Sequence, residues 1–256
     1  MKLDTFYRKA VAAGIARDPR GAEAVRKLLD EERERSKTFD GDERESWQED
    51  RLFNPYADTR ILAGDPSAEV RKVIAGIDMD AAEVMLAHTL NRDRGAGIDL
   101  VLAHHPQGVA LAQLPEVMRV QADMLAAMGV TVSVAEQLLD KRMDEVGRRV
   151  LPGNHGRAVD AARLLGLPMA CVHTPADNCV NTFLEDLFAR EKPARLKDLL
   201  ALLKTVPEYR AAVRRMAGPR IVSGSETGRC GRVSVEMTGG TEGAKSIYES
   251  YAASGV

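Results

Sequence analysis

The stretch Ile98-Asp99-Leu100-Val101-Leu102-Ala103-His104-His105-Pro106 contains the strongest indications of fold and function in this chain. Its apolar part is short and rich in branched residues, and runs of about 4–8 apolar residues between turn signals are typical of buried strands. Gly95 and Gly97 precede the run, and Pro106 ends it. The sequence therefore predicts a buried strand with two adjacent histidines at its carboxyl end, where open α/β sheets place their binding crevices.

The histidine pair also constrains the conformation of the backbone. Adjacent residues on a regular strand point to opposite faces of the sheet. The rings of His104 and His105 can share one cavity only if the chain turns out of the strand, and Pro106 forces such a change. The chain has five histidines in all, so an adjacent pair at a strand end indicates a metal site.

A second segment, Pro168-Met169-Ala170-Cys171-Val172-His173-Thr174-Pro175-Ala176-Asp177-Asn178, has the same design. A short apolar strand ends at His173, a turn carries Asp177, and a helix is expected from residue 178 to about residue 190. Two such strand ends would deliver imidazoles and a carboxylate to one edge of a sheet. For His173 three roles stay open, namely a metal ligand, a proton carrier and a structural hydrogen-bonding group.

Together the two segments predict a metal site with His104, His105 and Asp177 as ligands. Nitrogen and carboxylate ligands suit zinc, iron, manganese or nickel better than calcium. An aspartate can also bridge two ions in a site that activates water. We therefore expect a site for two divalent ions, with His173 as the candidate catalytic residue.

The composition excludes several classes of protein. The 256 residues include 36 basic and 38 acidic side chains, so no basic surface is indicated for nucleic acid. The amino terminus lacks the apolar region of a signal peptide, and no apolar stretch is long enough to span a bilayer. Three sparse cysteines fit a reducing compartment. We expect a cytoplasmic protein that acts on a small molecule and binds neither nucleic acid nor membrane.

Periodicity divides the chain into three parts. Residues 1–53 are predicted to form a helical extension, because apolar residues recur at helical spacing and a run of mixed charge follows. Residues 54–190 alternate strands and helices and are interpreted as a first α/β lobe. Within it, strands at 73–77 and 98–103 flank a helix from Asp80, which predicts a parallel βαβ unit. Residues 107–167 are interpreted as a largely helical insertion.

Residues 191–256 are interpreted as the start of a second α/β lobe. The segment 233–240 resembles the segment 73–80, so a strand at 233–237 and a following helix are expected. This imperfect repeat reaches Gly255-Val256 where its next strand would begin, so we expect a further strand and further ligands beyond Val256. Capping boxes at residues 133–136 and 205–208 predict two helix starts.

A glycine-rich loop in this last part is a candidate anion site. Gly239 and Gly240 lie between the predicted strand and a helix starting near Glu242, where backbone amides attract phosphate or carboxylate. The loop fits neither the Walker pattern nor the dinucleotide fingerprint. A tight turn without ligand is the alternative.

With these residues in place, the chain resembles the Nif-three-like family, widely labelled GTP cyclohydrolase I type 2 homologue. The resemblance rests on Asp99-Leu-Val-Leu-Ala-His-His-Pro, on His173-Thr-Pro-Ala-Asp177 and on the later segment 233–240. It covers roughly residues 54–256. The long extension before residue 54 and the helical insertion depart from the family pattern.

The resemblance implies a two-lobed α/β fold, a site for two divalent metal ions and assembly into hexameric rings. Carried over by position, His104, His105 and Asp177 match family metal ligands, and His173 matches a histidine that lines the same site. The family's remaining histidine and acidic ligands have no match here. Two functions follow as alternatives. One is a metal-dependent hydrolase of a nucleotide-like or phosphorylated small molecule; the other is a non-catalytic metal-binding scaffold, metal handler or regulatory interaction protein.

Overall fold

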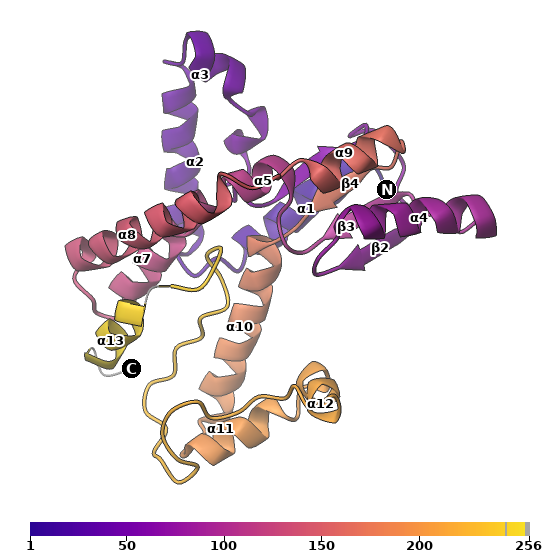
Figure 1. Ribbon diagram of the computed structural model, residues 1–256. Coiled ribbons are helices and arrows are strands. Elements are labelled where there is room, and N and C mark those ends of the chain that lie inside the picture. Colours follow the sequence, from indigo (N-terminus) through magenta and orange to yellow (C-terminus); the bar gives the residue numbers. More distant parts are fainter. Residues whose placement is uncertain (244, 254–256) are drawn as a thin grey trace.

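The computed structural model describes residues 1–243 and 245–253 and contains a four-stranded sheet (Figure 1). The strands are β1 (Arg60–Ala63), β2 (Val73–Gly76), β3 (Leu100–Ala103) and β4 (Met169–Cys171), in the order β1-β4-β3-β2. Strands β2, β3 and β4 run parallel, whereas β1 runs antiparallel to β4. Helix α4 (Ala81–Arg94) connects β2 to β3, so the predicted α/β class and βαβ unit are confirmed.

Helices make up most of the rest of the chain. The bounds are α1 (Leu3–Ile15), α2 (Ala22–Ser36), α3 (Gly41–Ser46), the 3-10 helix η1 (Glu49–Leu52), α5 (Gly108–Ala112), α6 (Leu114–Val117), α7 (Arg119–Ala127), α8 (Val132–Val150), α9 (Arg157–Leu164), α10 (Thr174–Glu191), α11 (Leu196–Leu203), α12 (Pro207–Arg214) and α13 (Lys245–Ala253). The regions 3–50 and 107–167 are therefore helical, as predicted. Where the domains begin and end stays a prediction. No helix of the described residues combines the length and apolar character needed to cross a membrane.

The sheet is packed on both faces because its strand residues alternate. Leu100 and Ala170 are buried against Leu3 of α1 on one face. Val101 and Met169 are buried on the other face, in a cluster with side chains of α4 and α9. A strand that buries both faces has apolar residues at every position, which is why these strands are uninterrupted apolar runs in the sequence.

Helix α1 is held tightly against α10. A Cβ atom added to Gly14 would lie 2.6 Å from the Pro175 Cα atom, so only glycine permits this approach. The Gly14 carbonyl oxygen also accepts a hydrogen bond from Asn178 Nδ2 at 3.1 Å. The first helix of the predicted extension therefore fixes the start of α10, which carries Asp177.

Two predicted capping boxes are wrong, and a third forms where none was predicted. Helix α8 begins at Val132, one residue before the proposed cap at Ser133, and Thr205 Oγ1 donates back to the Leu202 carbonyl oxygen. The box that forms belongs to α4. The Ala81 amide donates to Asp80 Oδ1 at 2.7 Å, and the Asp80 amide donates to the Glu83 carboxylate at 2.8 Å.

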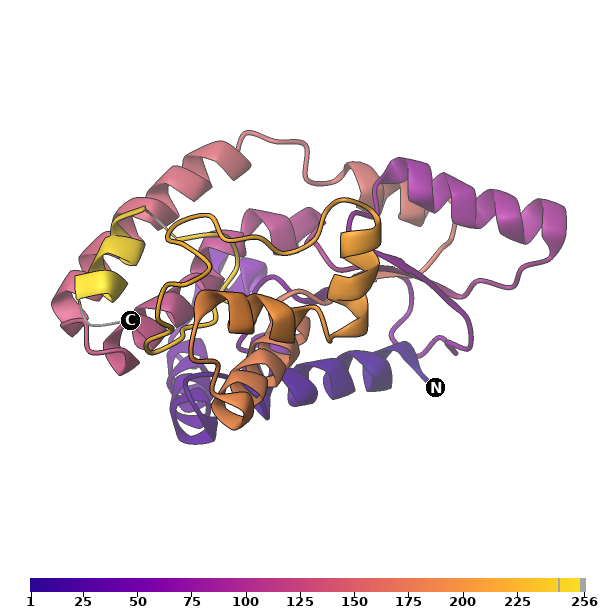
Figure 2. The ribbon, with the colours of Figure 1, turned by 90° about the horizontal axis from the view of Figure 1, so that it is seen from below.

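The predicted strand at 233–237 is also wrong. Within the described residues this segment pairs with no strand, and it instead lies alongside α10 in space. Val235 packs against Leu184 and Leu187 of that helix, and Thr238 Oγ1 donates to Asn178 Oδ1 at 2.6 Å. The segment then leads to α13, which lies against α8 in both views (Figures 1 and 2). The end of the proposed repeat, Gly255-Val256, lies outside the described residues.

Candidate metal site

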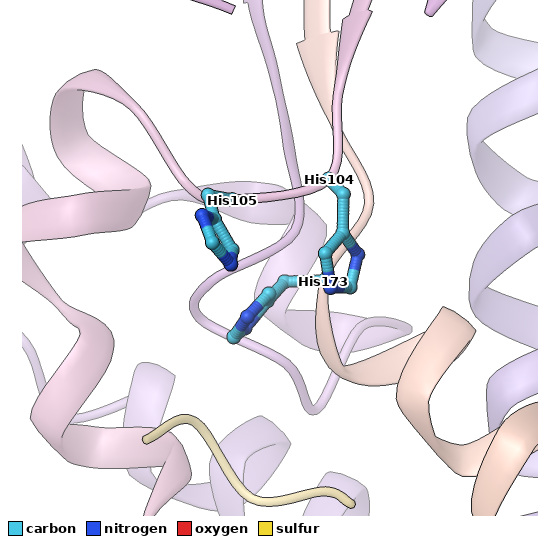
Figure 3. A group of neighbouring side chains, drawn as sticks. All are labelled: His104, His105 and His173. Atoms are coloured by element: carbon cyan, nitrogen blue, oxygen red, sulfur yellow. The ribbon is translucent and has the colours of Figure 1, made fainter. Parts of the chain in front are cut away.

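Three histidine rings meet at the carboxyl edge of the sheet. Strands β3 and β4 are parallel neighbours, so the residues that follow them lie side by side. Figure 3 shows His104, His105 and His173 pointing toward one another from these two strand ends. The ring centroids are 4.8 Å apart for His104 and His173, 5.3 Å for His104 and His105, and 5.7 Å for His105 and His173. One ligand nitrogen from each residue lies within 4.8 Å of the others.

The backbone leaves the regular strand pattern at the histidine pair, as predicted. Two consecutive amides, those of His104 and His105, donate to the carbonyl oxygens of Gly76 and Ile77, each at 2.9 Å. In a regular strand, successive amides point to opposite sides. This break allows both rings to face the same cavity.

Each of the three rings has its Nδ1 atom held by an oxygen. The three bonds run from His104 to the Val172 carbonyl oxygen at 3.2 Å, from His105 to Asp78 Oδ1 at 2.7 Å, and from His173 to Asp58 Oδ2 at 2.8 Å. A ring that donates through Nδ1 presents an unprotonated Nε2, as metal-binding histidines commonly do. The arrangement fixes the tautomer of a neutral ring and leaves Nε2 for a ligand.

Asp177 completes the constellation from the first turn of α10. Its Oδ1 atom lies 3.4 Å from His104 Nε2, and its Oδ2 atom lies 3.8 Å from His173 Nε2. Burial, with a further contribution from the charge of Asp58, raises the pKa of Asp177 to about 7, although His173 acts in the opposite direction. The structure therefore brings together all four residues singled out from the sequence.

Asp58 is an essential part of this arrangement that the sequence analysis did not single out. Its side chain is fully buried and accepts hydrogen bonds from His173 and from Thr174 Oγ1, the latter at 2.6 Å. The neighbouring Thr59 Oγ1 accepts the His173 amide at 3.1 Å. Asp58 lies 115 residues before His173 and just before β1, so no local sequence pattern connects it to that histidine.

A solved structure shares this fold. The NIF3 superfamily protein from Sphaerobacter thermophilus is 26% identical to this chain, with a TM-score of 0.66, and the alignment covers 78% of this chain and 71% of that one. The chain is similar in fold to this NIF3 superfamily protein. No protein-family model and no curated protein matches the sequence. The structural match agrees with the family resemblance drawn from the histidine motifs.

The environments of two histidines in the site push their pKa values in opposite directions. Burial lowers the pKa of His104, and the nearby His173 lowers it further. Burial alone would lower the pKa of His173 too, but the hydrogen bond and charge of Asp58, together with the charge of Asp177, outweigh it and raise that pKa. His104 is thus favoured as the neutral ring a metal needs, and His173 as the ring that retains a proton.

Cys171 lies close to the site without facing it as a ligand. Its thiol is fully buried, and burial raises its pKa to about 12. Its Sγ atom instead donates to the Asp58 carbonyl oxygen at 3.4 Å. A metal ligand must be a thiolate, so this environment opposes coordination by Cys171.

The glycine-rich loop lies against other elements. Gly239 and Gly240 have φ values of 86° and 85°, and the Gly239 carbonyl oxygen accepts a hydrogen bond from Gln121 Nε2 at 2.8 Å. A Cβ atom on Gly240 would contact Met118 and Leu114. The loop ends before α13, which begins at Lys245. Anion binding by these glycines stays a prediction.

Proposed function

We propose that this NIF3-like chain is a metal-dependent hydrolase that uses two divalent ions to cleave a nucleotide-like or phosphorylated small molecule. The observation that carries the proposal is the convergence of three imidazoles whose Nδ1 atoms are all engaged by oxygens. Hydrogen-bonded imidazoles beside a half-buried carboxylate are a typical setting for zinc, iron, manganese or nickel.

In this proposal His104, His105 and Asp177 hold the ions. The lowered pKa of His104 keeps its ring neutral, and Asp78 orients the ring of His105 through Nδ1. Asp177 faces the same space with both carboxylate oxygens and can bridge two ions. These residues would hold the divalent ions, whose chemistry when bound would be to lower the pKa of water toward neutrality and so provide a nucleophile.

In this proposal His173 is the acid–base group that holds and transfers a proton during hydrolysis. Its Nδ1–H donates to the buried Asp58 carboxylate, which stabilises the ring when Nε2 is also protonated. Its Nε2 atom lies on the same side as the Asp177 carboxylate, where the substrate would be cleaved. A pair of groups whose pKa values are pushed apart, as in His104 and His173, is a common basis for dividing ligand and acid–base roles.

The first test is metal content by elemental analysis. We expect the chain to bind up to two ions, and the double variant His104→Ala/His105→Ala to bind none. A matched control is His88→Ala, which removes a histidine of α4 outside the cluster and should leave metal content unchanged. Equal metal content in the double variant and the parent chain would refute the metal site.

The second test separates catalysis from binding. We expect His173→Gln to keep its metal while losing hydrolysis of a panel of nucleotides and phosphoesters. General acid–base groups commonly contribute about 10²–10⁴-fold to rate. Loss of metal in this variant would make His173 a ligand instead. Metal binding without hydrolysis in the parent chain would favour the non-catalytic scaffold or metal handler.

A further inference from the structure

A large cavity lies beside the sheet, with none of the clustered histidines in its wall. It occupies about 940 Å³ between the α2–α3 hairpin and α6, and η1 and the start of β1 also line it. Sites for small molecules commonly measure about 300–1,000 Å³. Figure 1 shows α2 and α3 projecting from the rest of the fold, and residues of both helices line the cavity.

The wall of the cavity combines guanidinium groups with two aromatic rings. Five arginines and four glutamates line it, and the aromatic side chains are Phe39 and Trp47. The two rings meet edge to face with centroids 6.1 Å apart, and the Arg35 guanidinium lies 5.3 Å from the centre of the Phe39 ring. Aromatic faces and guanidinium planes are surfaces on which flat rings stack.

Two of the four glutamates in the wall, Glu32 and Glu116, are paired with neighbouring side chains of the wall. Glu32 accepts a hydrogen bond from Trp47 Nε1 at 3.1 Å and lies 3.4 Å from the Arg35 guanidinium. Glu116 accepts a hydrogen bond from Arg51 Nη2 at 2.9 Å. These pairs preorganise the arginines and reduce the capacity of the glutamates to bind a cationic ligand.

One buried hydrogen-bond donor in the wall of the cavity has no acceptor. Arg60 is only 2% exposed, it pairs with Asp50, and its Nη2 atom reaches Gln113 at a long 3.4 Å. Its buried Nε atom has no hydrogen-bond partner among the described residues. A buried guanidinium N–H without an acceptor is costly, and an oxygen of a ligand would satisfy it.

We propose that this cavity is a second ligand site, for a planar aromatic compound that carries an anionic group. The ring would stack beside Phe39 and Trp47, and the anionic oxygens would accept from Arg60 and from arginines nearer the rim. Because such a ligand touches both the hairpin and α6, it also fixes the hairpin against the rest of the fold. The proposal is independent of the metal site.

Ligand binding in this cavity can be followed by intrinsic fluorescence, because Trp47 lines the cavity and is the single tryptophan of the chain. The experiment is a titration of Trp47 fluorescence with adenosine 5′-monophosphate as the probe, excited beyond the absorption of adenine. Adenosine supplies the ring alone, and ribose 5-phosphate supplies the anion alone. We expect a saturable change with adenosine 5′-monophosphate, and binding at least about tenfold weaker for the two partial probes.

Variants place the binding in the cavity. Arg35→Ala removes an exposed guanidinium beside Phe39 and should weaken binding about tenfold. The matched control is Arg33→Ala on the same helix, which breaks an equivalent ion pair with Asp30 outside the cavity and should leave binding unchanged. Arg60→Lys keeps the positive charge but loses the Nε–H, and should weaken binding similarly.

Three outcomes would overturn the proposal. One is the absence of a saturable fluorescence change at concentrations up to about 1 mM of the nucleotide. Another is equal binding of adenosine and adenosine 5′-monophosphate, which would remove the anionic requirement. The third is unchanged binding in Arg35→Ala, with its helix content verified by circular dichroism. The double variant His104→Ala/His105→Ala should bind the probe like the parent chain, whichever function the metal site has.

Discussion

Asp58 is the side chain on which the orientation of His173 depends. It is fully buried and binds both the His173 ring and the Thr174 hydroxyl, so no solvent can replace it. We predict that Asp58→Asn leaves the metal content unchanged and lowers the rate of hydrolysis by about 10²–10⁴-fold, the usual contribution of a general acid–base group, because His173 loses the carboxylate that orients its ring. Elemental analysis and turnover of the substrate panel would measure the two effects.

The comparison for this prediction is Asp78→Asn. Asp78 holds His105 in the same manner, but its side chain is 78% exposed, so water can take its place. Because His105 is a proposed ligand, we expect Asp78→Asn to lower metal affinity, by less than the roughly 10–100-fold effect usual for a buried partner. Competition with a chromophoric chelator would measure the affinity. Loss of metal in Asp58→Asn, or unchanged metal affinity in Asp78→Asn, would contradict the roles assigned to His173 and His105.

Asp177 links the site to the pH dependence of stability. Its pKa is raised from 3.8 to about 7 in the folded chain, so the folded state binds a proton that the unfolded state releases. The contribution of this group is therefore most favourable at low pH and is lost as pH rises toward 7. We predict that Asp177→Asn stabilises the metal-free protein, with a gain that grows between about pH 4 and 7 and reaches ~2–4 kcal/mol.

Urea unfolding in the presence of a chelator at pH 4.5 and pH 8 would measure this gain. The control is Asp144→Asn, which changes an exposed aspartate of α8 and should give the same stability as the parent at both pH values. A gain for Asp177→Asn of the same size at both pH values would contradict the assignment, because only a titrating carboxyl gives a pH-dependent difference.

At the scale of elements, the close approach of α1 and α10 fixes the position of Asp177. A Cβ atom on Gly14 would lie 2.6 Å from Pro175 Cα, a backbone atom that cannot move without displacing the start of α10. We predict that Gly14→Ala destabilises the protein by about 1–3 kcal/mol and weakens metal binding. Thermal unfolding and the same chelator competition would show both effects.

The chain offers a matched glycine for this test. Gly147 lies inside α8, and an added Cβ atom there would meet its nearest neighbour, Pro115, only at 4.0 Å. Alanine favours the helix interior by about 1 kcal/mol relative to glycine, so Gly147→Ala should stabilise the protein and leave metal binding unchanged. Gly14→Ala behaving like Gly147→Ala would contradict the packing role of Gly14.

The elements also show what could be predicted from sequence. Strands β2, β3 and β4 are apolar runs bounded by turns, and each was expected. Strand β1 begins at Arg60, whose buried charge is neutralised by Asp50, and a charged first residue hides a strand from a search for apolar runs. The failed strand at 233–237 has strand-like composition, but Val235 packs against α10 and the segment does not join the sheet.

The candidate site, like the fold, could be predicted from the sequence only in part. Histidines at two parallel strand ends could be placed together, because parallel neighbours end at one edge of a sheet. The oxygens that hold those rings could not be assigned, since Asp58 and the Val172 carbonyl become partners only through tertiary packing. Sequence therefore indicates the groups that face a ligand more readily than the groups that orient them.

At the scale of the whole molecule, the proposed metal site links binding to folding. The proposed ligands, from the end of β3 and from α10, come together only in the folded chain, so an ion that binds them would stabilise the folded state. At a free metal concentration of about 100 times the dissociation constant, the gain is ~2.7 kcal/mol. For a chain of this size, that gain corresponds to an increase of roughly 5–10 °C in Tm.

We therefore predict that a chelator lowers the Tm of the metal-loaded protein by this amount, and that adding zinc or manganese back restores it. The double variant His104→Ala/His105→Ala should unfold at one temperature with or without metal. His88→Ala, which alters a histidine outside the cluster, should respond to metal like the parent chain. An equal response of the double variant would mean that the stabilising ion binds elsewhere, because stabilisation by linkage requires the ligands themselves.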